Sequence, residues 1–207
     1  MTDPRAELVG RGYDAMVDTW EEWKAQITGD PRNDWLDDLV SRLEPGARVI
    51  ELGCGGGTEE TALLAAQFEL TGVDLSREQL RRARARIPQA RFIEADFATM
   101  QFEPGSAEAV VAFYSFNHVP RELLGGLLGR LRDALVPRGL LLAAFGASDN
   151  PGWTGDWLGA EMFFSGFEPA TNLRLVADAG LEVLREEVVT FREPEGPAQF
   201  HWVLAQR

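Results

Sequence analysis

The sequence predicts an α/β protein with a mostly parallel seven-stranded sheet, an antiparallel last strand, helices on both faces and an N-terminal helical cap. Three observations lead to this prediction. From residue 47 onward, apolar runs of strand length alternate with helical patterns, which is typical of βαβ units. The segment 109–113 is almost entirely apolar, as expected of a strand that is covered on both faces. The last two strand patterns are joined by the short link 192–197, which favours a hairpin.

Residues 1–45 are expected to form helices that cap the sheet. Apolar and aromatic side chains recur there at helical spacing, before and after a break at Asp30–Pro31. The second helical pattern ends at Glu44, where Pro45 and Gly46 follow. The side chains that carry this periodicity are Tyr13, Met16, Val17, Trp20, Trp23, Trp35, Leu36, Leu39, Val40 and Leu43.

Strands and helices then follow one another along the chain. Strand patterns cover 47–53, 68–74, 90–95, 108–114, 138–145, 181–191 and 198–205, and helical patterns cover 58–67, 76–87, 120–136 and 168–179. The segment 146–167 breaks this rhythm, and its glycines and aromatic residues predict a loop over the ligand face. We therefore expect one domain over 1–207, divided into a cap (1–45), a core (46–145) and a substrate-side loop, helix and hairpin (146–207).

Composition excludes several classes of protein. The 207 residues are 45% hydrophobic and 26% charged, which is ordinary for one globular domain. The net charge of −13 argues against nucleic acid as the main partner, and the arginine-rich segment 77–91 is interpreted as a solvated helix face. No apolar run is long enough for a membrane span, and the N-terminus lacks the pattern of a signal peptide. With Cys54 as the one cysteine, the expected location is cytoplasmic.

The segment 49–58 combines a short apolar run, the acidic Glu51 and a glycine-rich loop. Glycines here indicate that the backbone turns sharply or lies close to a ligand at the end of a first strand. A dinucleotide fingerprint would need glycine at 58, where the chain has Thr58, and the ending of a P-loop is absent. Glu51 would repel a pyrophosphate, but it suits an amino-bearing ligand.

Two more acids close the next two strand patterns. Asp74 follows the second strand, at the distance where an acid can bind ribose hydroxyls, and Asp96 follows the third. Three acids at successive strand ends fit a ligand with a ribose, donor groups and positive charge. S-adenosylmethionine has all of these.

The chain resembles the class I (Rossmann-like) S-adenosylmethionine-dependent methyltransferases, especially small bacterial ones with a helical N-terminal cap. The resemblance is strong over 47–145 and looser at both ends. It rests on motifs in the family's order, because a glycine loop alone would be weak evidence. The matching stretches are 51–57, 72–76, 94–97, 110–119, 135–141 and 200–205.

The resemblance implies a role for each matching residue. Glu51 would lie near the methionine amino group, and the loop residues Gly53, Cys54 and Gly55 would pass beneath the methionine and ribose. Asp74 would bind the ribose hydroxyls. The remaining implied cofactor contacts are Leu75, Asp96 and Phe97 at adenine, Phe113 and Tyr114 beside the sulfonium, and Tyr13 closing over the cofactor from the cap.

Among the two histidines and the one cysteine, one residue is a candidate for catalysis. His118 can serve as a general base near neutral pH, although a structural role at the start of a helix is an open alternative. His201 is expected mid-strand, and two scattered histidines do not predict a metal site. Cys54 lacks an activating neighbour, so it is interpreted as a small packing residue and not as a nucleophile.

Acceptor recognition is predicted for the aromatic segment after the fifth strand. Trp153, Trp157, Phe163 and Phe164 are candidates to line a pocket, because small-molecule sites are mostly apolar and aromatic, with simple core packing as the alternative. Arg32 is a candidate for binding an anionic group of the substrate, and a surface role is the alternative.

The resemblance implies transfer of a methyl group from S-adenosylmethionine to O, N or C of a small-molecule acceptor, with S-adenosylhomocysteine as product. The expected protein is a monomer or homodimer without nucleic-acid or membrane partners. Two alternatives stay open: a non-catalytic ligand- or partner-binding module on the same fold, and a nicotinamide-dependent oxidoreductase.

Overall fold

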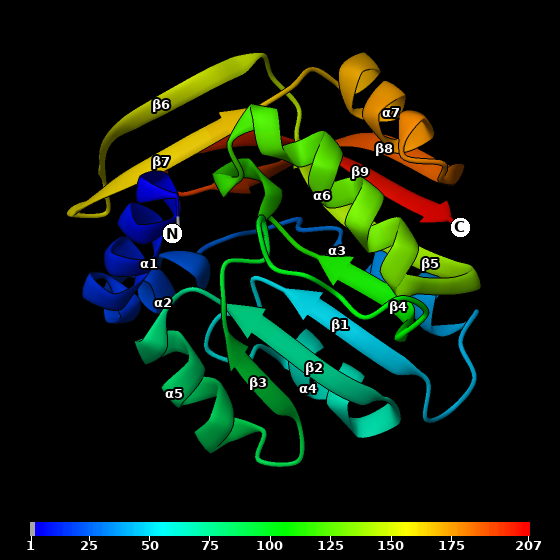
Figure 1. Ribbon diagram of the computed structural model, residues 1–207. Coiled ribbons are helices and arrows are strands. Elements are labelled where there is room, and N and C mark those ends of the chain that lie inside the picture. The colour runs from blue at the N-terminus through cyan, green and yellow to red at the C-terminus, as the bar shows by residue number, and fades with distance from the viewer. Residues whose placement is uncertain (1–2) are drawn as a thin grey trace.

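The computed structural model describes residues 3–207 and contains a seven-stranded sheet beside a two-stranded one (Figure 1). The strand order in the large sheet is β3-β2-β1-β4-β5-β9-β8. Its parallel part comprises β1 (Arg48–Leu52), β2 (Glu69–Asp74), β3 (Arg91–Glu94), β4 (Ala107–Ala112) and β5 (Leu135–Gly146). The last hairpin is formed by β8 (Glu182–Glu193) and β9 (Gly196–Gln206).

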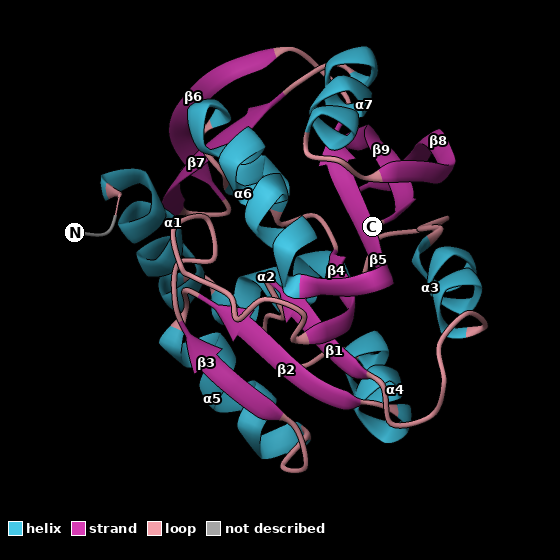
Figure 2. Ribbon diagram, turned by 45° about the vertical axis from the view of Figure 1, so that its right-hand side comes forward, coloured by secondary structure: helices cyan, strands magenta, loops and turns pink. Residues whose placement is uncertain are grey.

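Helices cover both faces of this sheet (Figure 2). On one face, α6 (Arg121–Ala134) and α7 (Pro169–Asp178) pack against alternate strand residues such as Leu141 and Val203. On the other face lie α3 (Arg32–Val40), α4 (Glu59–Gln67) and α5 (Arg77–Arg86), and the neighbouring residues Leu142 and Leu204 point to this side. The alternation follows from the two-residue period of a strand, and the predicted fold class is confirmed.

The last strand runs antiparallel, as predicted, but it does not lie at the edge of the sheet. It inserts between β5 and β8 and pairs antiparallel with both. Burial accounts for this position, because residues 202–205 have no exposed surface, whereas most of β8 is exposed or half-buried. A strand that is apolar on both faces is stable only inside a sheet, so the more polar β8 takes the edge.

The predicted cap divides into two parts. The helices α1 (Pro4–Ala15) and α2 (Val17–Lys24) lie beside α5 and the small sheet, at the carboxyl ends of the parallel strands (Figure 1). Asp14 joins α1 to the core, because its Oδ1 accepts hydrogen bonds from Ser76 Oγ at 2.6 Å and Glu78 N at 3.0 Å. In contrast, α3 packs on a face of the large sheet. Residues 1 and 2 of the expected cap lie outside the described residues.

The structure corrects the prediction of a loop over 146–167. This segment forms an antiparallel hairpin of β6 (Asn150–Trp157) and β7 (Ala160–Gly166). Its turn is made by Leu158 and Gly159, which both have positive φ (53° and 82°), as tight hairpin turns require. The many glycines and tryptophans hid this strand pattern, in which β7 buries Met162 and Phe163 against α1.

The arginine-rich face of α5 is only partly solvated. Arg77 and Arg81 are exposed, as predicted. Arg82, however, pairs with Asp18 at 2.5 Å and Glu21 at 3.0 Å, and Arg86 also pairs with Glu21. These ion pairs join α2 to the core.

No helix within residues 3–207 is long and apolar enough to cross a membrane.

We expect Trp202→Ala to lower the free energy of unfolding by about 3–5 kcal/mol, because it leaves a large cavity in the core. Trp202 is fully buried in β9, and its indole stacks on Trp35 of α3 with ring centroids 5.7 Å apart. The control is Trp153→Ala, since Trp153 is 45% exposed. Urea unfolding measures both changes, and equal losses would contradict this account of the core.

Candidate functional site

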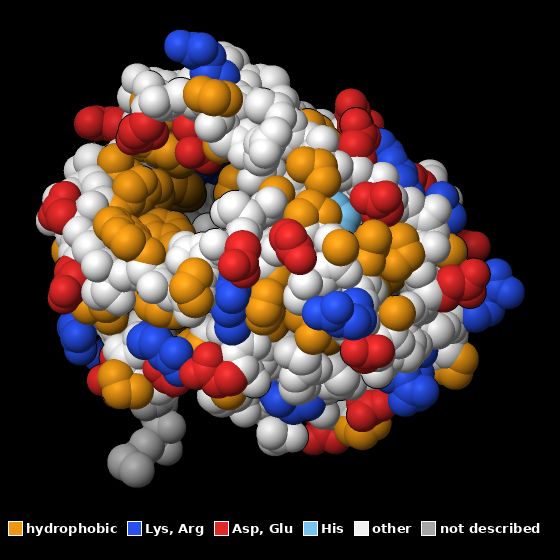
Figure 3. All heavy atoms as spheres, turned by 90° about the horizontal axis from the view of Figure 1, so that it is seen from above, with side chains coloured by type: hydrophobic (Ala, Val, Ile, Leu, Met, Phe, Trp, Pro, Cys, Tyr) orange, Lys and Arg blue, Asp and Glu red, His pale blue; other side chains and the backbone are white. Residues whose placement is uncertain are grey.

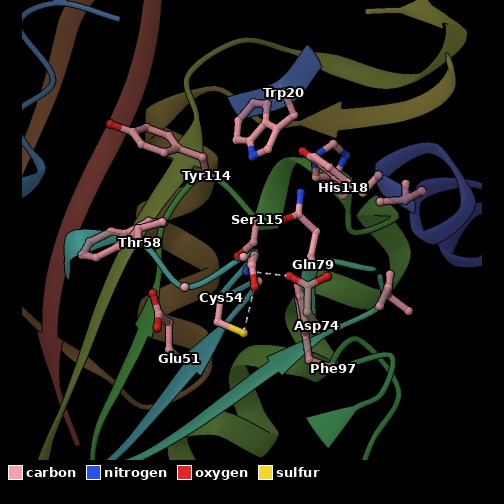
Figure 4. Close-up of a pocket in the computed structure, with 18 of the residues that line it drawn as sticks. Trp20, Glu51, Cys54, Thr58, Asp74, Gln79, Phe97, Tyr114, Ser115 and His118 are labelled. Carbon is pink, nitrogen blue, oxygen red and sulfur yellow. Dashed lines mark hydrogen bonds between the residues drawn. The ribbon is translucent and has the colours of Figure 1, made fainter. Parts of the chain in front are cut away.

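A cavity of about 560 Å³ lies at the carboxyl ends of β1, β2, β3 and β4, beneath α1 and α2 (Figure 4). This is where open α/β sheets bind their ligands. Figure 3 shows a hollow with hydrophobic walls on one face of the molecule, with acidic side chains around its rim. The cavity wall includes every predicted cofactor residue: Tyr13, Glu51, Gly53, Cys54, Gly55, Asp74, Leu75, Asp96, Phe97, Phe113 and Tyr114.

The glycine loop is shaped by close packing at Gly53. This residue has a φ of +73°, and a Cβ there would lie 2.5 Å from Ser115 Cβ. The neighbouring hydrogen bonds are short, because Gly53 N donates to Val73 O at 2.8 Å and Ser115 Oγ donates to Leu52 O at 2.9 Å. No side chain fits at this position, so the loop backbone itself forms the floor of the cavity.

Glu51, next to the last residue of β1, is a buried acid without a cationic partner among residues 3–207. Its side chain is 4% exposed, Oε1 accepts a hydrogen bond from Thr61 Oγ1 at 3.1 Å, and Oε2 has no partner. Burial raises the pKa of this carboxyl to about 8, since the charged form loses its hydration. An ammonium group beside the free oxygen would satisfy it and stabilise the carboxylate.

Thr58, which stands where a dinucleotide fingerprint has glycine, caps α4. Its Oγ1 accepts from Thr61 N, and Thr61 Oγ1 accepts from Thr58 N, so two amides at the start of the helix are satisfied within the protein. A phosphate bound at a helix N-terminus needs such amides free. The start of α4 therefore contacts the buried Glu51 and is poorly suited to bind a pyrophosphate.

Asp74 and Asp96 are held in place by backbone amides and, for Asp96, by the Thr99 hydroxyl, which donates to it at 2.9 Å. Asp74 accepts from Gly55 N at 2.8 Å and Ser76 N at 2.9 Å, and burial is the main reason that its pKa is raised. Asp96 accepts from Ala98 N at 2.9 Å. Carboxylate oxygens have further lone pairs, so both acids can also accept hydrogen bonds from a ligand.

His118 and Tyr13 form a hydrogen-bonded pair at the cavity wall. His118 Nδ1 lies 2.8 Å from Phe163 O, and because a carbonyl only accepts, Nδ1 carries the proton. The other nitrogen, Nε2, then accepts from the Tyr13 hydroxyl at 2.9 Å. Burial lowers the pKa of His118 to about 4, so the ring is neutral at physiological pH. The catalytic role of His118 stays a prediction.

Arg32 lies in the cavity wall, 8% exposed, at the same end as Glu51. Its guanidinium pairs with Asp30 at 2.9 Å and Glu60 at 3.4 Å, whereas Nε has no partner. Lys24 lies in the same wall and makes no ion pair within residues 3–207. One end of the cavity therefore offers an unsatisfied carboxylate oxygen together with unsatisfied cationic donors.

The end of β4 contributes the aromatic residues predicted beside a sulfonium. Tyr114 has a φ of +55°, an unfavourable conformation for a non-glycine residue. Its hydroxyl donates to Asp30 at 2.6 Å and its ring packs edge-on against Phe200, so surrounding contacts hold the turn. Strained backbone of this kind gathers at functional sites, and here it directs Phe113 and Ser115 toward the cavity.

The structure places the four aromatic candidates for acceptor recognition outside the cavity wall. Trp157, Phe163 and Phe164 lie in the β6–β7 hairpin and pack with the cap. The Phe164 ring lies 4.7 Å from His118 and that of Trp157 lies 5.7 Å from Trp20, between centroids. These side chains therefore back the residues that line the cavity, and Trp153 is exposed. Their role toward the acceptor stays a prediction.

Among the wall residues that sequence reasoning missed are Trp20 and Lys24 from α2, and Gln79 from α5. Gln79 is 2% exposed, and neither polar atom of its side chain has a partner. The Ser76-x-x-Gln79 spacing indicates a capping box, in which the glutamine would bond Ser76 N. Asp74 takes that amide instead, which leaves the carboxamide to point into the cavity (Figure 4).

Comparison with known proteins agrees with this geometry. Residues 49–139 match the family model of a methyltransferase domain. Trans-aconitate 2-methyltransferase of Paracidovorax citrulli is 36% identical over 120 residues, which cover 54% of this chain and 44% of that protein. The chain thus matches less than half the length of such curated relatives.

Solved structures show the same fold at low sequence identity. Magnesium protoporphyrin IX methyltransferase from Synechocystis, with bound S-adenosylmethionine, superposes with a TM-score of 0.75 at 18% identity, covering 100% of this chain and 98% of that one. The [4+2]-cyclase SpnF gives 0.74 at 17% identity, covering 100% and 97%. The chain therefore resembles the class I (Rossmann-like) S-adenosylmethionine-dependent methyltransferases over residues 49–139 and in its fold, and the predicted resemblance is confirmed.

We expect the affinity for S-adenosylhomocysteine to rise with pH by about tenfold per unit below pH 8 and then level off. The raised pKa, about 8 against the ordinary glutamate value of 4.5, keeps Glu51 protonated in the free protein, so binding of an ammonium group releases a proton. Calorimetry in buffers of different ionisation enthalpy detects this proton. Glu51→Gln should bind weakly without the slope, and the exposed Glu103→Gln should keep it.

We expect Gln79→Met to weaken binding of S-adenosylhomocysteine by about tenfold, while the free protein becomes slightly more stable. The physical reason is that methionine removes two buried polar atoms that have no partner until a ligand supplies one. Calorimetry and thermal unfolding measure the two effects, with the exposed Gln101→Met as control. A loss of stability together with unchanged affinity would contradict a ligand-facing role.

Proposed function

We propose that this protein transfers a methyl group from S-adenosylmethionine to an O, N or C atom of a small-molecule acceptor. The observation that carries the proposal is the order of groups along one cavity. Glu51 of β1 and Arg32 lie in the wall at one end, Asp74 ends the neighbouring β2, with Gln79 in the helix that follows it, and Asp96 and Phe97 follow β3, the next strand of the sheet. This order matches an ammonium and a carboxylate, a ribose, and an adenine.

The protein's residues fit these groups by hydrogen bonding and charge. The free Glu51 Oε2 accepts a hydrogen bond from the ammonium group, and the free Arg32 Nε donates one to the methionine carboxylate. The anionic group that Arg32 binds is then this carboxylate of the cofactor. Asp74 accepts from the ribose hydroxyls and Gln79 donates to them. Phe97 and Leu75 pack on adenine, and Asp96 accepts from its amino group.

S-adenosylmethionine supplies an electrophilic methyl carbon on a sulfonium, and displacement at that carbon requires the acceptor atom in line with the breaking bond. The protein contributes by positioning the two molecules and by excluding water, which α1 and α2 do by covering the cavity. Tyr13 presents only lone pairs to the cavity, because its proton is donated to His118. The pair can therefore accept a hydrogen bond from the acceptor.

The alternatives are less well supported. A nicotinamide cofactor would place its pyrophosphate against Glu51 and the capped start of α4. A non-methyltransferase role has a precedent on this fold in a protein described as a [4+2]-cyclase. Such a role predicts cofactor binding without methyl transfer.

We also propose the partners, the location, the oligomeric state and the domain division of this protein. A net charge of −13 supports the absence of a nucleic-acid partner, and one free cysteine, buried Cys54, suits a reducing cytoplasm. We further propose a monomer or homodimer that works without a membrane partner, and one domain made of cap, core and substrate-side segments with the predicted bounds 1–45, 46–145 and 146–207.

We expect S-adenosylhomocysteine to bind with a dissociation constant on the order of micromolar, and Asp74→Asn to weaken it by about tenfold or more, because one anionic acceptor is lost. Calorimetric titration with S-adenosylhomocysteine and with NAD distinguishes the cofactors, and transfer of radiolabel from S-adenosylmethionine to acceptors tests turnover. Binding of NAD alone would favour an oxidoreductase. Cofactor binding without transfer to any acceptor class would favour a binding module.

A further inference from the structure

The cavity wall carries more negative than positive charge. Its cations are Lys24, Arg32 and Arg86, and its acids are Asp3, Glu21, Glu51, Glu59, Asp74 and Asp96. Within residues 3–207, the last four acids make no ion pair, and although Glu51 is protonated in the free protein, Glu59, Asp74 and Asp96 leave the wall negative. Acidic side chains also surround the hollow in Figure 3. An anion that enters this cavity therefore meets a field of its own sign.

The two arginines of the wall are already neutralised by the protein. Arg32 pairs with Asp30 and Glu60, and Arg86 pairs with Glu21 at 2.7 Å and donates to Gly56 O at 3.0 Å. The donors left over are Arg32 Nε and Lys24, at the Glu51 end. In the proposed function, these meet the cofactor's own carboxylate, so no cationic side chain of the wall remains for an anionic acceptor.

The wall opposite the glycine loop is aromatic. Trp20, Tyr114 and His118 surround the part of the cavity farthest from Glu51 and Cys54 (Figure 4), and Phe113 is a further aromatic residue of the wall. The indole N–H of Trp20 points into the cavity (Figure 4). Such a wall takes up a flat apolar molecule, and its one free donor can orient a single hydroxyl or carbonyl group.

We propose that the methyl acceptor is an aromatic molecule without net negative charge, held against Trp20 and Tyr114, and that polycarboxylates are excluded from this site. The inference rests on the proposed function, which it narrows to a class of acceptor. It separates this chain from the relatives named trans-aconitate 2-methyltransferase, whose named substrate is a tricarboxylate.

The test uses acceptors that share one nucleophile and differ in charge: catechol, 3,4-dihydroxybenzoate and 4,5-dihydroxyphthalate, with trans-aconitate as the polycarboxylate. Binding of each to the protein saturated with S-adenosylhomocysteine is followed by tryptophan fluorescence and calorimetry. Methyl transfer is followed with labelled S-adenosylmethionine. We expect catechol to bind, each added carboxylate to weaken binding by about tenfold, and trans-aconitate to stay unmethylated.

A designed cation tests whether charge is the cause. Ala25 is an exposed residue of the cavity wall at the end of α2. Ala25→Lys should improve binding of the phthalate relative to catechol by about tenfold, and the matched Ala25→Gln should leave this ratio unchanged. An unchanged ratio in the lysine variant would overturn the electrostatic argument.

Other outcomes overturn the inference directly. Methylation of trans-aconitate, or binding of the phthalate as tight as that of catechol, would show that anions are accepted. If S-adenosylhomocysteine binds but no catechol does at millimolar concentration, the aromatic class is wrong although the cofactor assignment stands. If S-adenosylhomocysteine itself does not bind, the proposed function fails first.

Discussion

The site depends on the close approach of Gly53 to Ser115. Because no Cβ separates them, the ends of β1 and β4 come together, and the Gly53 amide bonds to Val73 at the end of β2. Three neighbouring strands thereby finish at one level, which brings Glu51, Asp74 and the turn at Tyr114 around one cavity. A side chain at position 53 would separate these strand ends, so a single steric condition sets the positions of groups far apart in sequence.

Burial of acids gives this geometry its affinity for a positively charged ligand. Glu51 is buried with only one of its oxygens bonded, and Gln79 keeps both polar atoms without partners. Each unsatisfied group lowers the stability of the free protein, and a ligand that satisfies it recovers that loss on binding. The capped start of α4 also prepares the site, because Thr61 takes part in the cap of the first helical turn and orients Glu51 through a hydrogen bond. The free protein is thus less stable because of the same groups that the proposed ligand would satisfy.

The sequence predicted the large sheet well because its signals are local. Apolar runs ending in Glu51 and Asp74 identify the strands, and glycines identify the loop between sheet and helix. What it missed depends on tertiary partners. The place of β9 between β5 and β8 follows from relative burial, and the role of Gln79 follows from Asp74 taking the amide that a capping box would use. The β6–β7 hairpin was hidden because its glycines and tryptophans also suit a loop.

The similarity to known methyltransferases covers the cofactor half of this cavity and only part of the wall proposed for the acceptor. The stretch 49–139 contains Glu51, Asp74, Asp96 and Phe113, and it is the part that the methyltransferase family model matches. Trp20, which faces the proposed acceptor, comes from α2, and the aromatic layer behind His118 comes from β6 and β7. These segments lie outside the matched stretch, whereas Phe113, Tyr114 and His118 lie inside it. The acceptor of a relative is therefore weak evidence against the charges of this wall, because part of the wall comes from segments that the family model does not match.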